Sequence, residues 1–330
     1  MKRITIKDIA KALNVHHSTV SRALRDDSSV SNETKKKVLG YAKKYGYQIN
    51  RSALQLRGNA SNVIGVIVPN IYHNFFSNII SYITNYAFSQ GYIVSVFQSN
   101  ESVSQEKEII KAIVQNNMAG VIASLSMETS DTAHFKLLHK FGIPLVLFDR
   151  VNNDIEAPKV VLNNQLALEQ TVDLLVQKGC EKIAYLSGIS SVLLYSERQK
   201  GYMAGLLKNK LAYKRIIELT DGFTIQNGMK ITRQLLEGVE KPDAIICDSH
   251  LLMQGFFAEY ARVENRPEQI KIASFGGYQG IYSVYPGVIF IQQPENEMAV
   301  ASFNTLLNCI SNEPEKLNTI EKFEASIFEN

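Results

Sequence analysis

Several features that define other classes of protein are missing from this 330-residue chain. It has no tryptophan, and its three cysteines, Cys180, Cys247 and Cys309, are odd in number and far apart, which predicts free thiols rather than a disulfide framework. No run of eighteen apolar residues occurs, so we expect no membrane span. The start, MKRITIKDIA, lacks the apolar segment of a secretory signal, so we expect a cytoplasmic protein.

Motifs of enzymes and cofactor sites are missing as well. No G-x-G-x-x-G follows a strand-like run, and the chain has no phosphate-binding loop motif and no G-x-S-x-G nucleophile elbow. The pairs His16/His17 and His134/His139 lack the i,i+4 spacing of two metal ligands on one helix. We therefore expect no enzymatic activity, no cofactor and no bound metal.

What is present begins with an uneven distribution of charge. The net charge is +3, but residues 1–58 hold thirteen Lys and Arg against four Asp and Glu. The rest of the chain holds 22 basic and 28 acidic residues, so a head of net charge +9 precedes a body of net charge −6. Such a head is typical of a nucleic-acid-binding module, although a charge run alone is more often a solvated surface.

Residues 5–24, TIKDIAKALNVHHSTVSRAL, predict two short helices joined by a tight turn. Thr5 and Asp8 have roughly the spacing of a capping box at the start of the first helix. Asn14 interrupts the apolar pattern, and asparagine tolerates the left-handed backbone that such a turn requires. The apolar residues that recur at helical spacing are Ile6, Ile9, Ala10, Leu13, Val20, Ala23 and Leu24.

Polar side chains are left outside on the second helix, which we expect to begin near His17. Hydroxyl, imidazole and guanidinium groups at one helix end suit phosphates and base edges, so the two helices predict a helix-turn-helix that binds the major groove of DNA. An ordinary helical hairpin is the alternative on apolar spacing alone. The predicted DNA-binding residues are His17, Ser18 and Arg22 for base edges, and Thr5, Thr19 and Ser21 for phosphates.

A third helix is predicted over residues 32–45, capped by Ser31, ended by Gly46 and with Tyr45 facing inward. Residues 50–57, NRSALQLR, are a shorter helical pattern with too little apolar area to be stable alone. A frayed linker is therefore one interpretation of this stretch.

Beyond residue 62, short β-branched runs alternate with helical patterns. The runs show little polar–apolar alternation, as in strands buried on both faces. They are NVIGVIVP, YIVSVF, GVIAS, IPLVLFD, KVVLN, KIAYLSG, DAIICD, KIASFGG and GVIFIQQP. Helices are expected near residues 75–90, 103–117, 131–141, 164–178, 196–210, 249–263 and 295–311. This alternation predicts an α/β fold with two lobes, each a doubly wound parallel sheet.

Ligands of such sheets bind beyond the carboxyl ends of the strands. Aromatic rings, carboxylates and guanidinium groups at those positions suit a polyhydroxylated ligand. The alternatives are that Phe75 and Phe76 belong to the core and that Asp149 and Arg150 form a structural ion pair. The predicted effector-binding residues are Phe75, Phe76, Ser124, Asp149, Arg198, Phe223 and Asp248.

The segments TIKDIAKALNV, STVSRAL and VSNETKKKVLGYAKKYGYQINRSALQLRG closely resemble the DNA-binding domain of the lactose-repressor (LacI/GalR) family, and the resemblance continues along essentially the whole chain. It implies a helix-turn-helix head over residues 1–48, a hinge helix and linker over 49–61, and an effector-binding and dimerisation domain over 62–330. The effector-binding domain would have two lobes, one of about residues 62–160 with 293–330 and one of about residues 161–292. The chain would cross between these lobes three times, as in periplasmic sugar-binding proteins.

The resemblance also implies roles for single residues. Asn50, Ala53 and Leu56 fall in the hinge helix, where Leu56 would pry apart a base step in the minor groove. Asp149 matches a sugar-binding carboxylate, and Arg198 matches the arginine of an R-x-x-G-[YF] motif. Phe76 and Phe223 match, respectively, a stacking or apolar pocket position and an aromatic that lies over the ligand.

Three positions depart from the family pattern. Ile49 stands where proline is frequent, and Gly276-Gly277 stands where many relatives carry an acidic residue. Ser249-His250 replaces a usual Asn-Asp, and His250 either contacts the ligand or caps the following helix. The pocket is therefore expected to lack one carboxylate.

The resemblance implies a homodimeric transcription regulator that represses carbohydrate-related genes, binds a pseudo-palindromic operator in double-stranded DNA and responds to a sugar or sugar derivative. The absence of a leucine-heptad tail after residue 312 favours a dimer over a coiled-coil tetramer. The alternatives are a sugar-binding module without a DNA role, which predicts a signal peptide and no basic head, and a sugar-processing enzyme.

Overall fold

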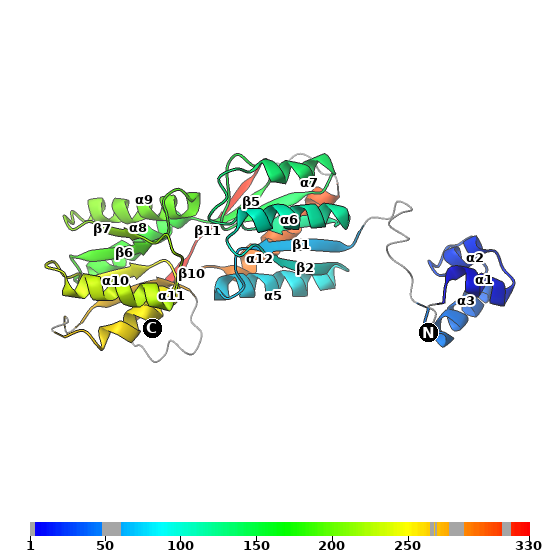
Figure 1. The fold of residues 1–330 in the computed structure, drawn as a ribbon, viewed down its shortest axis with the longest axis horizontal. Coiled ribbons are helices and arrows are strands. Elements are labelled where there is room, and N and C mark those ends of the chain that lie inside the picture. The colour runs from blue at the N-terminus through cyan, green and yellow to red at the C-terminus, as the bar shows by residue number, and fades with distance from the viewer. Residues whose placement is uncertain (1–3, 48–60, 265–266, 268, 277–286, 312–317) are drawn as a thin grey trace. The chain divides into compact units, whose positions relative to one another are not determined.

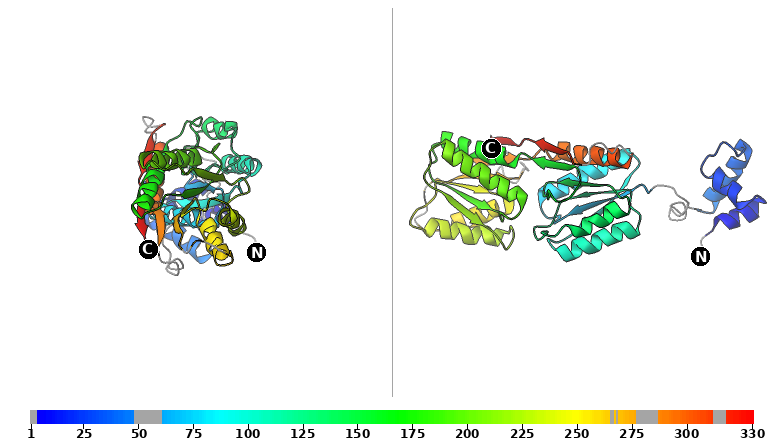
Figure 2. Two further views of the ribbon diagram at one scale, coloured as in Figure 1. Left: turned by 90° about the vertical axis from the view of Figure 1, so that its left-hand side faces the viewer. Right: turned by 90° about the horizontal axis from the view of Figure 1, so that it is seen from above.

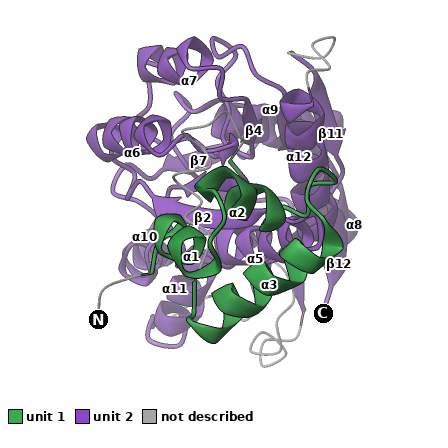
Figure 3. Cartoon of the chain, turned by 90° about the vertical axis from the view of Figure 1, so that its right-hand side faces the viewer, with its two compact units in different colours: residues 1–61 green, residues 62–330 purple. Residues whose placement is uncertain are grey.

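The computed structural model describes residues 4–47, 61–264, 267, 269–276, 287–311 and 318–330 (Figure 1). The chain divides into two compact units, residues 1–61 and residues 62–330, which Figure 3 draws in different colours. None of the described helices is long and apolar enough to cross a membrane.

Over residues 4–47 the first unit is a head with three helices, α1 (Ile6–Leu13), α2 (His17–Ala23) and α3 (Asn32–Lys44). The predicted turn between α1 and α2 is confirmed, because Asn14 has the left-handed φ of 50°. The predicted capping box is confirmed as well. The Thr5 hydroxyl accepts a hydrogen bond from the Asp8 amide, and the Asp8 carboxylate accepts one from the Thr5 amide.

The core of the head is small and joins all three helices. Its buried residues are Ile9, Ala10, Val20, Ala23, Val30, Val38 and Ala42. The prediction that Tyr45 faces inward is wrong, because this side chain is 50% exposed. Helix α3 ends at Lys44, and the ring of Tyr45 lies against Tyr41 with a centroid separation of 4.4 Å.

The second unit contains two six-stranded sheets with matching strand orders, β11-β5-β4-β3-β1-β2 and β12-β10-β9-β8-β6-β7. The first sheet consists of β1 (Val63–Val68), β2 (Ile93–Gln98), β3 (Gly120–Ala123), β4 (Leu145–Phe148), β5 (Lys159–Leu162) and β11 (Ile320–Phe323). The second consists of β6 (Ile183–Ser187), β7 (Arg215–Glu218), β8 (Ala244–Cys247), β9 (Lys271–Phe275), β10 (Val288–Gln292) and β12 (Ser326–Glu329). Among the described strands, only β12 pairs antiparallel, with β10.

Helices cover both faces of each sheet (Figure 2). In the first lobe, α5 (Asn74–Ser89) and α12 (Glu295–Ile310) lie on one face, opposite α6 (Val103–Gln115), η1 (Ala133–Phe135) and α7 (Lys136–Lys140). In the second lobe, α8 (Asn164–Gln177) and α9 (Leu193–Lys208) lie opposite α10 (Ile225–Glu237) and α11 (His250–Tyr260). The predicted pair of doubly wound α/β lobes is confirmed.

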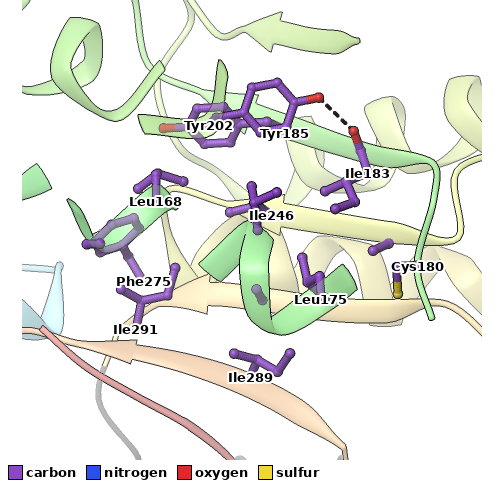
Figure 4. Packing of buried hydrophobic residues seen from close by; sticks show 14 of the residues in the cluster. Leu168, Leu175, Cys180, Ile183, Tyr185, Tyr202, Ile246, Phe275, Ile289 and Ile291 are labelled. Carbon is purple, nitrogen blue, oxygen red and sulfur yellow. Dashed lines mark hydrogen bonds between the residues drawn. The ribbon is translucent and has the colours of Figure 1, made fainter. Parts of the chain in front are cut away.

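The central strands are apolar on both sides because each side faces a helical layer. Ile64 and Val66 pack toward α5 and α12, whereas Ile67 packs toward α6 and α7. The fully buried Tyr185 and Tyr202 are compatible with this apolar interior because their hydroxyls have hydrogen-bond partners. The hydroxyl of Tyr202, for example, donates to the carbonyl of Ile183 at 2.7 Å (Figure 4).

The chain crosses between the lobes three times: after β5, after β10 and between β11 and β12. The expected lobe boundaries are wrong in two places. Strand β5 lies wholly in the first sheet, so the first lobe extends past residue 160, and residues 326–329 pair within the second sheet rather than the first.

Other local expectations also need correction. Strands β7, β11 and β12 and helix α10 were not among the elements predicted from periodicity. Helix α9 begins at Leu193, three residues before its expected start. Strand β2 is only partly buried, because it forms an edge of the first sheet.

The close pairing of α10 with α11 rests on two glycines. A methyl group added at Gly228 would lie 2.5 Å from the carbonyl oxygen of Leu252 and 3.0 Å from the Cα of Gly255. The helices therefore approach closely only because neither residue has a side chain at this contact.

We expect Gly228→Ala to destabilise the second unit by about 1–3 kcal/mol, because overpacking forces the two helices apart. Urea unfolding followed by circular dichroism measures the change. Gln234→Ala, at an exposed position of the same helix, is the control and should leave the midpoint nearly unchanged. Equal midpoints for both variants would contradict the close-contact argument.

Candidate functional site

The head presents the first turn of α2 on its surface. His16 caps this helix, since its Nδ1 accepts a hydrogen bond from the Ser18 amide, and its ring lies 4.1 Å from that of His17 between centroids. His17 and Arg22 are exposed, and Ser18 and Thr19 are half-buried. These side chains are the ones expected to reach base edges or phosphates.

Two of the residues predicted to contact phosphates, Ser21 and Thr5, have hydroxyls that bond within the head. Ser21 is only 5% exposed, and its hydroxyl accepts a hydrogen bond from Arg25, so the expectation that it lies outside is wrong. Thr5 is exposed, but its hydroxyl already donates to the Asp8 carboxylate at 2.7 Å. The hinge residues Asn50, Ala53 and Leu56 lie outside the described residues.

The second unit has a cleft where the two lobes meet. Its walls come from segments that follow the carboxyl ends of strands in both sheets. The lining residues are His73, Asn74, Phe75, Phe76, Asp149, Arg150, Leu194, Tyr195, Arg198, Phe223, Asp248, Ser249, His250, Phe275, Gly276 and Gln293.

Arg198 is held in the cleft by the second lobe. Its Nη1 donates to the Asp248 carboxylate at 2.9 Å and its Nε donates to the Asn164 side-chain oxygen at 2.8 Å. Its guanidinium carbon lies 3.4 Å from the centre of the Phe275 ring. The plane of the guanidinium is thereby fixed, and its remaining N–H groups are available to a ligand.

Asp248 positions Arg198 and is itself fully engaged. Besides the arginine, it accepts hydrogen bonds from the Tyr185 hydroxyl at 2.8 Å and from the Gly188 amide at 3.0 Å. It therefore lines the cleft mainly as the partner that orients Arg198.

Asp149 lines the cleft from the first lobe. Burial raises the pKa of its carboxyl, and the nearby charges of Arg150 and Arg198 and a hydrogen bond with the Gln293 side chain oppose that shift. Its backbone φ of 57° is unusual for a residue other than glycine. Strain of this kind is frequent where a side chain is held for binding.

Arg150 does not pair with Asp149, contrary to one alternative raised above. Its Nη1 donates to both carboxylate oxygens of Glu101, at 2.7 and 2.9 Å. Its guanidinium carbon lies 5.8 Å from the ring centres of both Phe76 and Tyr195, which come from different lobes. The arginine therefore lies between aromatic rings of the two lobes.

Two histidines face each other across the cleft. His73, which precedes α5, and His250, the first residue of α11, have ring centroids 6.3 Å apart. Burial lowers the pKa of His73 to about 4, with a further contribution from the charge of Arg150, and burial also lowers the pKa of His250. Both rings are therefore neutral near pH 7. The cap of α11 is Ser249, not His250.

The cleft brings together six of the seven predicted effector-binding residues, namely Phe75, Phe76, Asp149, Arg198, Phe223 and Asp248. Ser124 does not reach it, because this residue is fully buried and its hydroxyl accepts a hydrogen bond from the Arg150 amide. The core alternative holds in part for Phe76, which is buried yet lines the cleft.

Sequence reasoning missed several lining residues, among them His73, Tyr195, Phe275 and Gln293. Each follows or ends a strand, or begins the next helix, so the strand-end rule could have identified them. Gly276 lines the wall beside His250 and leaves room there. Within the described residues, no group of three His, Cys, Asp or Glu side chains could hold a metal ion.

Family models match nearly the whole chain. Residues 5–50 match the model for bacterial regulatory proteins of the lacI family. Residues 61–323 match the model for periplasmic binding proteins and the sugar-binding domain of the LacI family.

Individual relatives agree with these matches. The ribose operon repressor of Halalkalibacterium halodurans is 27% identical over 94% of this chain and 91% of the relative. The transcriptional repressor CytR of Escherichia coli K12 is 28% identical over 92% of this chain and 89% of the relative. A crystal structure of the Lac repressor dimer bound to operator and the anti-inducer ONPF has a TM-score of 0.86 with 22% identity and covers 99% of this chain and 98% of that one.

The lowered pKa of His73 predicts a pH dependence of stability. Between pH 6.5 and about 4 the unfolded chain binds a proton at this histidine and the folded chain does not, so stability falls as the pH falls through this range. The slope contributed is at most about 1.4 kcal/mol per pH unit.

Melting temperatures measured from pH 7 to pH 4.5 check this expectation. His73→Gln should lose less stability over that range than the unmodified protein does. His139→Gln, at an exposed histidine of α7, is the control and should follow the unmodified protein. If the stability of His73→Gln depends on pH in the same way as that of the unmodified protein, the buried His73 is not the cause of the loss of stability at low pH.

Proposed function

Because this chain belongs to the LacI family of bacterial regulatory proteins, we propose that it represses carbohydrate-related genes as a sequence-specific, DNA-binding homodimer controlled by a sugar-like effector. One observation carries the proposal. A basic helix-turn-helix head and a two-lobed cleft with a carboxylate and an oriented arginine occur in one chain.

On the DNA side, α2 would enter the major groove of each half-site. His17, Ser18 and Arg22 would contact base edges, with Arg22 suited to the O6 and N7 atoms of guanine. Thr5 and Thr19 would contact phosphates, whereas the burial of Ser21 argues that it supports α2 instead. In a dimer the two heads would bind a pseudo-palindromic operator, because protein symmetry is mirrored in the half-sites.

The hinge segment would connect effector and operator. We propose that Asn50, Ala53 and Leu56 contact the minor groove when two hinge helices form side by side, with Leu56 as the wedge between base pairs. Effector binding would change the angle between the two lobes. This change would alter the fraction of dimers in which the two hinge helices can form side by side on DNA.

On the effector side, Asp149 and Arg198 would bind adjacent hydroxyl groups, since one offers acceptors and the other N–H donors. Phe75, Phe76 and Phe223 would pack against the C–H faces of a sugar ring. The homologous Lac repressor has been crystallised as a dimer on operator with an anti-inducer, which supports the same assembly here. We place this activity in the cytoplasm, where the DNA is.

Two other functions, a sugar-binding module and a sugar-processing enzyme, require different features of the chain. A sugar-binding module without a DNA role has no use for a basic head, and a sugar-processing enzyme needs reacting groups beyond a binding cleft. The named relatives are repressors. A mobility shift of DNA from the protein's own promoter region, with no turnover of a sugar panel, would favour the regulator over both rivals.

We expect Arg22→Ala to lower the affinity for the operator by about tenfold to a hundredfold, because a bidentate contact to guanine contributes about 1–3 kcal/mol. Gel-shift titrations against operator and scrambled DNA measure specific and non-specific affinity. Lys36→Ala, an exposed charge loss on α3, should at most weaken binding to both DNAs alike. Undiminished preference for the operator in Arg22→Ala would refute its role in base recognition.

We expect Arg198→Lys to lose the response of operator binding to effector while DNA binding itself survives. Lysine keeps a positive charge beside Asp248 but lacks the planar fork that a sugar diol would use. The effector response is measured as operator release or retention in the presence of each sugar. Lys208→Arg, on the exposed end of the same helix, is the control, and a normal response in Arg198→Lys would contradict the cleft assignment.

A further inference from the structure

Each of the two arginines in the cleft already has a carboxylate partner within the protein. Arg198 donates to Asp248, and Arg150 donates to both oxygens of Glu101. Three of these four side chains are more than nine-tenths buried, and Glu101 is about one-quarter exposed. Each guanidinium charge is therefore compensated before any ligand arrives.

Glu101 is not one of the residues that line the cleft, so it contacts Arg150 from outside the lining. Its Oε2 also accepts a hydrogen bond from the Met127 amide at 2.8 Å. Glu101 and the preceding Asn100 both have positive φ angles, 60° and 53°, which are unfavourable for residues other than glycine. The chain thus maintains a strained turn that places this carboxylate under Arg150.

The other titratable groups of the cleft add no positive charge. His73 and His250 are neutral because burial lowers the pKa of each imidazole. Asp149 adds a third acidic group to the site. Lys159 lines a neighbouring cavity rather than the cleft, and its ammonium donates to the carbonyls of Ile155 and Ala157.

We propose, on the basis of the effector role proposed above, that the cleft selects an uncharged, hydroxyl-rich ligand and that Glu101 enforces this choice by occupying Arg150. A phosphate or carboxylate would enter a buried site in which, among the residues that the structure describes, no cation is left without a partner, and an unpaired buried charge is strongly disfavoured. Hydroxyl groups avoid this penalty, because they can donate to Asp149 and accept from the N–H groups of Arg198 that remain.

The isosteric variant Glu101→Gln tests this assignment. It releases Arg150 from its carboxylate without changing the size of the side chain, so the cleft should acquire affinity for anions. Galacturonate is the anionic probe and galactose its neutral counterpart, both measured by calorimetric titration of the full-length protein. Glu108→Gln, which removes the same charge on the exposed side of α6, is the control.

We expect the affinity for galacturonate to rise at least about tenfold in Glu101→Gln relative to both the unmodified protein and the control, since one charge-assisted hydrogen bond is gained. Galacturonate binding by the unmodified protein as tight as that of Glu101→Gln would overturn the proposal. So would a folded Glu101→Gln whose affinity for galacturonate is unchanged.

A second measurement keeps the proposal testable if Glu101→Gln does not fold. Melting temperatures of the unmodified protein are compared for matched pairs: galactose with galacturonate, and ribose with ribose 5-phosphate. A larger rise with either anion than with its neutral counterpart would overturn the proposal, and the reverse order supports it. Failure of the regulator function itself would appear separately, as a lack of operator preference in gel shifts without any sugar.

Discussion

The buried ion pair of Arg198 and Asp248 is the interaction on which the ligand cleft depends. Helix α9 carries the arginine, and the carboxylate follows β8 and also accepts from Tyr185 of β6. Removing one partner of such a pair costs about 3–5 kcal/mol, because the other charge stays buried and unpaired. The same contacts therefore stabilise the second lobe and fix the guanidinium that would meet a ligand.

The first lobe supplies a second carboxylate and a second arginine to the cleft, Asp149 and Arg150. Asp149 follows β4 with a left-handed backbone, and Arg150 beside it is held by Glu101 from the strained turn after β2. Because the two lobes contribute complementary groups, a ligand that binds both would favour one relation of the lobes over others. A coupling between ligand and operator needs such a difference in affinity and no further chemistry.

Much of this could be predicted from particular residues. The Thr5–Asp8 spacing predicted the capping box, Asn14 predicted the left-handed turn, and the β-branched runs predicted strands buried on both faces. Six of the seven residues predicted to bind an effector line the cleft, because the carboxyl ends of parallel strands lie at one edge of a sheet. Errors arose where the local pattern carries no information on packing. Ser21 is polar and was expected to be exposed, but it is buried and its hydroxyl accepts a hydrogen bond from Arg25. The sequence of β12 does not reveal which sheet this strand joins.

The sequence by itself determined most of the helices and strands, the basic head and the residue types available at the strand ends, because periodicity, capping and charge are local properties of the chain. Strands β7, β11 and β12 and helix α10 are the elements it did not reveal. Only the tertiary structure decided which charges meet. Glu101 and Arg150 are 49 positions apart, and Arg198 and Asp248 are 50 apart. Pairings over such separations depend on how the strands are ordered in space, which local residue patterns do not encode.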